Sequence, residues 1–189
     1  MIDKREQILK ATAEMIVEHG LQACPMSKIS ALAGCGAGTI YRYFETKQDL
    51  VKALFDDLIT KLTAACTEGY DASLPLRERF FTLWGNYYRY VLANPCQRAL
   101  MDQLLASPTI CAEHRENSLT VLQQVIGQLL DDGKHQGVFK DLPNELLNTV
   151  TYGSLSMMAK KQQQAPEKFS CVSCDEEDIL SLCWDAIRR

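Results

Sequence analysis

The chain has 189 residues, of which 47% are hydrophobic and 23% charged, with 10 Gly and 6 Pro. This composition excludes a disordered, collagen-like or low-complexity chain, because each of these is poorer in apolar residues or far richer in Gly and Pro. A formal net charge of -4 and a pI near 5.4 argue against a uniformly basic nucleic-acid-binding protein, although they leave room for a local binding surface.

Helical periodicity begins close to the N-terminus. Apolar residues recur at spacings of three and four between Asp3, a candidate N-cap, and Gly20, a candidate C-terminal stop, which predicts a first helix. A second, short helix follows Cys24-Pro25, and its expected apolar face comprises Met26, Ile29, Leu32 and Ala33. After glycines at 34 and 36, a third short helix is expected over residues 37–44.

Longer helices fill the rest of the chain. The first opens near Lys47, and Pro, Gly and capping residues delimit the others at 75–93, 95–106, 108–134, 144–164 and 175–189. No stretch alternates apolar and polar residues in the manner of a strand. The sequence therefore predicts an all-α fold of about nine helices, with a head of three helices at residues 1–48 and a larger helical body at 49–189.

Residues 27–50 combine a helix, a tight glycine turn and a second helix with small residues at its start. This is the arrangement of a helix-turn-helix, whose second helix enters the major groove of DNA. Bulk at positions 36–38 would hold the backbone away from the base edges. Ile40 and Phe44 are expected to face inward, which leaves the neighbouring polar side chains and Lys47, at the start of the next helix, for phosphates or bases.

The string Gly38-Thr39-x-Tyr41-x-Tyr43-Phe44-x-x-Lys47-x-x-Leu50 resembles the recognition segment of the TetR family of bacterial transcriptional regulators. The resemblance implies that Thr39, Tyr41, Tyr43 and Lys47 contact operator DNA. The full expected DNA-binding set is Ser27, Lys28, Gly36, Ala37, Thr39, Tyr41, Arg42, Tyr43 and Lys47. Pro25 and Gly36-Ala37 depart from the capping Thr and the polar or basic residues that the family often has there.

Two other interpretations of this segment are weaker. Tyr41 and Tyr43 could be surface aromatics of an ordinary bundle, but the complete string is far less common than an aromatic pair. The glycines at 34, 36 and 38 lack the preceding strand and the spacing of a phosphate-binding loop. Residues 1–50 carry no net charge, because they hold six basic residues (Lys4, Arg5, Lys10, Lys28, Arg42, Lys47) and six acidic ones (Asp3, Glu6, Glu14, Glu18, Glu45, Asp49).

In the family, the body binds a ligand among its middle helices and forms a homodimer through its last two. Aromatic residues at helical spacing suit a pocket for a flat or amphipathic molecule, although the same stripe would serve as plain core. The resemblance implies a ligand-responsive regulator, and we expect a repressor released by a small hydrophobic or aromatic effector. The expected ligand-binding residues are Leu58, Leu62, Trp84, Tyr87, Tyr88, Val91, Leu104, Tyr152 and Leu155.

A homodimer is also expected from symmetry, since two heads must reach half-sites about 34–36 Å apart on the double-stranded operator. The helices at 144–164 and 175–189 would supply its interface. Candidate interface residues, for which core within one chain is the competing assignment, are Leu146, Leu147, Val150, Leu155, Leu180, Leu182 and Trp184.

The chain has eight cysteines, and two of its segments have the spacing of metal ligands. Cys171 and Cys174 suit a thiol- or metal-sensing regulator, and Cys111 with His114 offers a second pair. We favour inert thiols, with no metal and no cofactor. No catalytic motif is present, so an enzyme is not expected, and a helical adaptor is a further alternative. The uncharged stretches are too short for a membrane span and no signal peptide is evident, which predicts a cytoplasmic protein.

Overall fold

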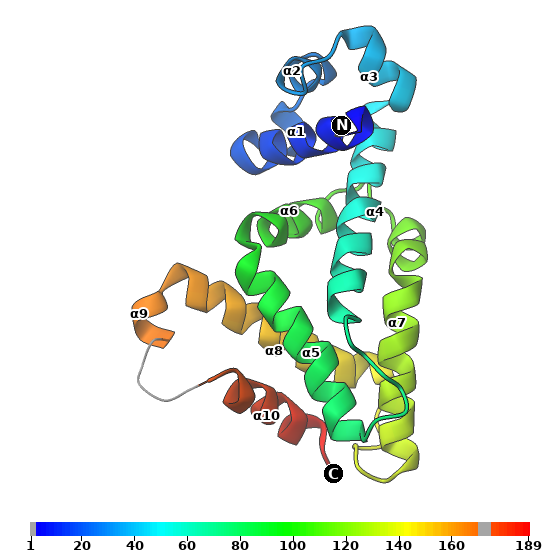
Figure 1. Ribbon diagram of the computed structural model, residues 1–189, viewed down its shortest axis with the longest axis vertical. Coiled ribbons are helices and arrows are strands. Elements are labelled where there is room, and N and C mark those ends of the chain that lie inside the picture. The colour runs from blue at the N-terminus through cyan, green and yellow to red at the C-terminus, as the bar shows by residue number, and fades with distance from the viewer. Residues whose placement is uncertain (1–2, 170–174) are drawn as a thin grey trace. The chain divides into compact units, whose positions relative to one another are not determined.

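The computed structural model describes residues 3–169 and 175–189, and almost all of their regular structure is helical (Figure 1). In these residues only an isolated bridge, between Phe139 and Arg188, has strand-like pairing. The all-α prediction is therefore confirmed. The helices are α1 (Lys4–His19), α2 (Met26–Leu32), α3 (Ala37–Tyr43), α4 (Lys47–Cys66), α5 (Leu76–Ala93), α6 (Pro95–Leu105), α7 (Ala112–His135), α8 (Asn144–Gln164), α9 (Pro166–Phe169) and α10 (Glu176–Ile187), with a 3-10 turn η1 (Leu21–Ala23).

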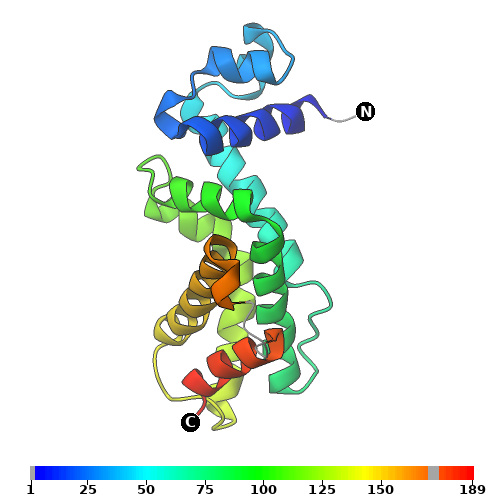
Figure 2. The same cartoon turned by 90° about the vertical axis from the view of Figure 1, so that its left-hand side faces the viewer.

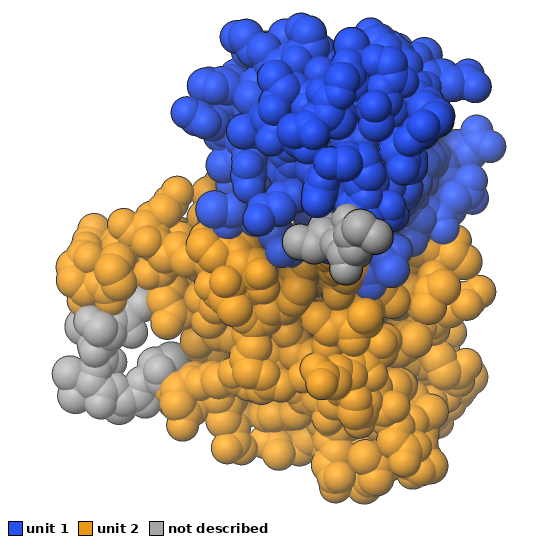
Figure 3. Space-filling model, turned by 45° about the horizontal axis from the view of Figure 1, so that its top comes forward, with its two compact units in different colours: residues 1–60, 96–118 blue, residues 61–95, 119–189 orange. Residues whose placement is uncertain are grey.

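The chain packs into two compact units (Figure 3). Unit 1 comprises residues 1–60 and 96–118, and unit 2 comprises residues 61–95 and 119–189. Helices α4 and α7 each contribute to both units. The division of function between residues 1–48 and 49–189 stays a prediction.

In unit 1, the ends of α1 lie where capping chemistry places them. The Asp3 side chain accepts a hydrogen bond from the Arg5 amide, and Gly20 ends the helix with a φ of 78°. Helices α1, α2 and α3 share a core in which Ile8, Ile29 and Ile40 are fully buried. This core holds the turn between α2 and α3 in place.

Two expected details of unit 1 are wrong. Leu32 is 52% exposed, because the buried face of α2 runs through positions 26, 29, 30 and 33, and position 32 lies off this face. Helix α7 starts at Ala112 instead of residue 108. The Thr109 amide donates to Ser107 Oγ at 3.2 Å, and the Ile110 amide donates to the Ser107 carbonyl at 3.1 Å. These turns, anchored by the buried Ile110 side chain, delay the helix.

In unit 2, α5 packs against α8 and α10, which are orange and red in Figure 2. Aromatic rings from α5, from the loop after α7 and from α10 interlock, since the Trp184 ring centroid lies 5.2 Å from that of Phe80 and 5.0 Å from that of Phe139. The last helix was expected to start near residue 175, and it starts at Glu176, where Asp175 is the N-cap and forms a capping box with Asp178. None of the described helices combines the length and the apolar character that a membrane span requires.

Replacing Gly133 with Ala is expected to destabilise the protein by about 2 kcal/mol, because overpacking a filled core costs about 1–3 kcal/mol. A Cβ atom there would lie 2.0 Å from Cδ2 of the buried Phe139 ring. Gly127 on the same helix is the matched control, since its Cβ would meet no atom within 4 Å. Urea unfolding of both variants measures the difference, and equal stabilities would contradict the expectation.

Candidate functional site

Helix α3, the expected recognition helix, faces inward with its apolar side chains and outward with its polar ones. Ile40 is fully buried and Phe44 is 4% exposed, which confirms their expected orientation. Tyr41 is 51% exposed and Tyr43 is 37% exposed. The Arg42 guanidinium carbon lies 5.4 Å from the centroid of the Tyr43 ring, so the helix's single cation is held beside an aromatic ring.

All nine expected DNA-binding residues lie in unit 1, on α2, on α3 and its N-terminal flank, and at the start of α4. The seven residues besides Tyr41 and Tyr43 differ in exposure. Thr39 and Lys47 are half-buried, whereas Ser27, Lys28, Gly36, Ala37 and Arg42 are exposed. A Cβ atom at Gly36 or Gly38 would meet no atom within 4 Å. The packing of the chain therefore does not require glycine at either position.

Lys47 has a contact within the head. Its Nζ donates to the Leu21 carbonyl at 2.7 Å, which ties the start of α4 to η1. Cys24, fully buried beside these elements, has its pKa raised by burial, and the positive charges of Lys47 and Lys28 offset part of this shift. The Lys47 ammonium keeps two further protons for an external acceptor.

Sequence reasoning missed the capping box at the start of α4. Thr46 Oγ1 accepts from the Asp49 amide at 3.1 Å, and Asp49 Oδ2 accepts from the Thr46 amide at 3.1 Å. The Thr-x-x-Asp spacing was the available signal. Because the Asp49 amide already donates its proton to the Thr46 hydroxyl, this amide is not available to bind a phosphate.

The expected ligand-binding residues divide between the two units. Seven lie in unit 2, and two, Leu58 and Leu104, are buried in unit 1. Trp84, Tyr87, Tyr88, Val91 and Leu155 belong to the core of unit 2, and we call these five residues the aromatic cluster. Leu62 packs at the edge of this core, and the ring of Tyr152, which is 41% exposed, lies 5.4 Å from that of Tyr87.

The polar atoms of the aromatic cluster are mostly paired. Tyr88 donates its hydroxyl proton to Gln162 Oε1 at 2.7 Å. Burial, and after it the neighbouring Tyr152, raises the pKa of the Tyr87 hydroxyl, so Tyr87 stays neutral. Trp84 differs: its Nε1 is buried and has no hydrogen-bond partner among the described residues.

A buried ion pair in unit 2 was not expected. The Arg79 side chain is 4% exposed, and its guanidinium lies 2.8 Å from Asp132 Oδ2 and donates twice to the Tyr70 hydroxyl at 3.1 Å. The hydrogen bond from Arg79 holds the pKa of the Asp132 carboxyl below its usual range. Arg79 lies on the apolar face of α5, where periodicity gives no signal for a charge.

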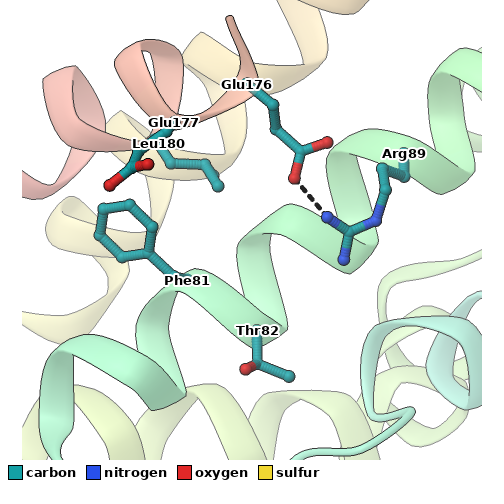
Figure 4. A pocket seen from close by; sticks show the side chains of 6 residues that line it. All are labelled: Phe81, Thr82, Arg89, Glu176, Glu177 and Leu180. Carbon is teal, nitrogen blue, oxygen red and sulfur yellow. Dashed lines mark hydrogen bonds and ion pairs between the residues drawn. The ribbon is translucent and has the colours of Figure 1, made fainter.

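An open groove of about 410 Å³ lies between α5 and α10, lined by Phe81, Thr82, Arg89, Glu176, Glu177 and Leu180 (Figure 4). Arg89 pairs with Glu176 across it, and the Arg77 guanidinium lies 3.5 Å from the Glu177 carboxylate and 4.1 Å from the Phe81 ring centroid. Positive and negative side chains are thus balanced along this groove.

The thiols divide into buried and exposed groups. Burial raises the pKa of Cys66 to about 12 and that of Cys183 to about 11, so both stay protonated. Cys111 is exposed, and His114 Nε2 lies 3.0 Å from Asp56 Oδ1. Cys171 and Cys174 lie outside the described residues. Within the described part of the chain, no group of three potential metal ligands comes together.

The dimer candidates separate clearly by burial. Leu147, Leu155, Leu180 and Trp184 are buried in the core of unit 2, which is the competing assignment within one chain. Leu146 and Val150 on α8, and Leu182 on α10, are 48%, 38% and 60% exposed. Only these last three keep a surface for a partner.

Comparison with known proteins now identifies the family. Residues 8–54 match the model of bacterial regulatory proteins of the tetR family, and residues 75–188 match a Tetracyclin repressor-like C-terminal domain. A helix-turn-helix-type transcriptional regulator of Haemophilus influenzae is 30% identical over 106 residues, which is 56% of this chain and 57% of that protein.

Solved structures agree over the full length. A TetR family protein from Vibrio parahaemolyticus is 30% identical, with a TM-score of 0.81 and 99% of each chain covered. The fold also resembles that of the regulator FadR from Bacillus subtilis in complex with stearoyl-CoA, at 20% identity, a TM-score of 0.77, and coverage of 96% of this chain and 98% of that one. The matched family consists of DNA-binding transcriptional regulators and not of enzymes, and this chain belongs to the TetR family.

Proposed function

We propose that the protein is a ligand-responsive repressor, which binds operator DNA through α3 as a homodimer and releases it when a small apolar effector binds unit 2. The DNA-binding part of this proposal rests on the exposure of Gly36 and Gly38. Both are exposed and carry no side chain, so the backbone at the start of α3 is open to a close approach from outside the protein. Such an approach is what a recognition helix needs in order to enter the major groove of DNA.

Binding would use the outward residues of α3. With small residues at positions 36–38, the backbone can approach the base edges closely. Tyr41 and Tyr43 present their hydroxyls to phosphates, and Arg42 supplies the cation of this helix. Thr39, Ser27, Lys28 and Lys47 complete the proposed surface. Because residues 1–50 carry as many acids as bases, hydrogen bonds contribute more to this binding than net charge.

The exposed apolar residues of α8 and α10 support a homodimer. Leu146 and Val150 are four residues apart, so they lie on one face of α8, and Leu182 is the most exposed large hydrophobic residue that we find on α10. A two-fold axis would bury these faces against their counterparts in a second copy. A dimer in turn presents two heads to the two half-sites of an operator.

The aromatic cluster supports an effector with a long apolar part. Its side chains combine flat aromatic surfaces with few polar atoms, and the flexible Met158 packs against the same core. The FadR relative was solved with stearoyl-CoA, and we propose an acyl thioester of this kind as the effector. An effector releases DNA by binding more tightly to a conformation that does not match the operator.

Fluorescence anisotropy with DNA from upstream of the protein's own gene tests the proposal. We expect saturable binding at two chains per operator, and a loss of affinity of roughly 5- to 150-fold on adding stearoyl-CoA, which is the usual range of allosteric coupling. Coenzyme A without the acyl chain is the control ligand. Absence of specific DNA binding would refute the regulator, whereas DNA binding that ignores stearoyl-CoA would refute only this effector.

A further inference from the structure

The indole nitrogen of Trp84 lacks a partner in a place where partners are expected. Trp84 is 2% exposed, and its Nε1 finds no acceptor among the described residues. Buried polar groups in folded proteins are nearly always hydrogen-bonded, so such an exception calls for an explanation. The packing of the ring does not require a nitrogen, since its neighbours in the core of unit 2 are largely apolar, with the Phe80 and Tyr87 rings at 6.4 and 5.9 Å.

The other hydroxyls of the aromatic cluster, and the buried cation on the same helix, are already engaged. The Tyr88 hydroxyl is bonded to Gln162, and the Tyr87 hydroxyl shares hydrogen bonds with Tyr152 and Ser156. Arg79, the buried cation on the same helix, is held by Asp132 and Tyr70. The Trp84 N–H is therefore the donor of the aromatic cluster that remains available to an entering molecule, and the one buried charged side chain among the described residues, Arg79, is already paired.

These two facts define the chemistry of the ligand. A free carboxylate placed here would lose its hydration without gaining a cation, which is strongly unfavourable. A neutral carbonyl would lose less and would gain the hydrogen bond. We propose that the effector presents the neutral carbonyl oxygen of an acyl ester or thioester to Trp84 Nε1, and that this contact makes the site select acyl derivatives over free acids.

This inference rests on the proposed function, because it assumes that the effector enters the aromatic cluster. The test uses ligands that differ by one group: stearoyl-CoA, its thioether analogue S-octadecyl-CoA, which has a methylene in place of the carbonyl, and stearate. Each is titrated into the wild-type protein and into the Trp84→Phe variant by calorimetry. Trp184→Phe is the control variant, because it makes the same substitution in the core of unit 2 at a residue outside the aromatic cluster.

We expect the wild-type protein to bind stearoyl-CoA about tenfold more tightly than the thioether, which is the ratio expected for one hydrogen bond, and to bind stearate most weakly. Trp84→Phe should bind the thioester and the thioether within about twofold of each other, because loss of the N–H removes the discrimination. Trp184→Phe should keep the preference. A purely structural role for Trp84 would weaken both CoA ligands equally and would overturn the inference.

A second measurement does not depend on the folding of any variant. The chain has two tryptophans, so the amide-region NMR spectrum contains two indole N–H signals. Stearoyl-CoA should shift the Trp84 signal downfield, and the thioether should not. An unshifted signal at saturation refutes the contact while leaving the effector in place. If the wild-type protein does not bind stearoyl-CoA, both this inference and the proposed effector fail, whereas DNA binding is judged separately.

Discussion

Replacing Gly38 with Leu is expected to reduce operator affinity at least about 100-fold, or roughly 2.7 kcal/mol, while the protein stays folded. Gly38 is exposed near the start of α3, its Cβ would meet no atom within 4 Å, and its backbone does not need a positive φ. Leu favours a helix over Gly by about 0.5–1 kcal/mol in helix interiors, so the melting temperature should hold or rise.

The loss of affinity arises only in the complex. A leucine side chain at position 38 would lie between the start of α3 and the bases. It would hold the helix away from the DNA and so weaken several protein–DNA contacts at once, instead of removing a single one. Anisotropy with operator DNA measures the affinity, and circular dichroism measures the melting temperature. Gly127→Leu is the control, because it makes the same substitution on α7, where the Cβ also has open space. Operator binding by Gly38→Leu within threefold of the wild type would contradict this surface.

Replacing Asp132 with Asn should lower the free energy of unfolding by about 3 kcal/mol, because it leaves the Arg79 guanidinium buried without a counter-charge. We take the lower end of the usual range of about 3–5 kcal/mol because Asp132 itself is 26% exposed and water can partly replace it. For a chain of this size, the melting temperature should fall by roughly 6–12 °C. Calorimetry and urea unfolding provide both values.

The destabilisation should depend on pH with a definite sign. The pKa of Asp132 is lowered in the folded protein, chiefly by the hydrogen bond from Arg79. The carboxylate therefore stabilises the fold above its unfolded pKa of about 4, and this contribution is lost as the pH falls through the lower folded pKa. The difference between wild type and Asp132→Asn should be constant from about pH 6 to 8 and shrink below about pH 4.

Asp131→Asn provides the matched control for this ion pair. Asp131 precedes Asp132 on α7 and pairs with Lys134 at 3.0 Å, but the carboxylate is 48% exposed. An exposed ion pair contributes about 0–1 kcal/mol, so the control should be destabilised far less. Equal losses in the two variants would show that burial of Arg79 does not determine the stability.

The elements of this fold could largely be read from local chemistry. Asp3, Gly20 and Asp175 set helix ends through their own side chains or backbone, and each was predictable. The start of α7 was not, because it depends on Ser107 bonding to two amides and on a buried Ile110. Leu32 was misplaced for a similar reason: seven residues are too few for an apolar count to decide which side of α2 is buried.

The candidate sites show the same difference between features set within one helix and features set by tertiary packing. The exposure of Tyr41 and Tyr43 and the burial of Ile40 and Phe44 follow from periodicity within one short helix. The ion pair between Arg79 and Asp132 joins residues far apart in the sequence. Whether Trp84 Nε1 has a hydrogen-bond partner depends on all the atoms that surround it in the folded protein, which a sequence pattern does not reveal. Leu58 and Leu104 were grouped with the aromatic cluster by residue type, whereas packing places them in the interior of unit 1.

The buried thiols give each unit its own chemical reporter of opening. Cys24 is fully buried in unit 1, whereas Cys66 and Cys183 are 2% exposed in unit 2. Because burial raises the pKa of all three, a thiol reagent can modify them only after the surrounding core has opened. Mass spectrometry of the modified peptides therefore yields separate opening rates for the two units within one molecule. An effector that stabilises only unit 2 would slow modification at positions 66 and 183 and leave the rate at position 24 unchanged.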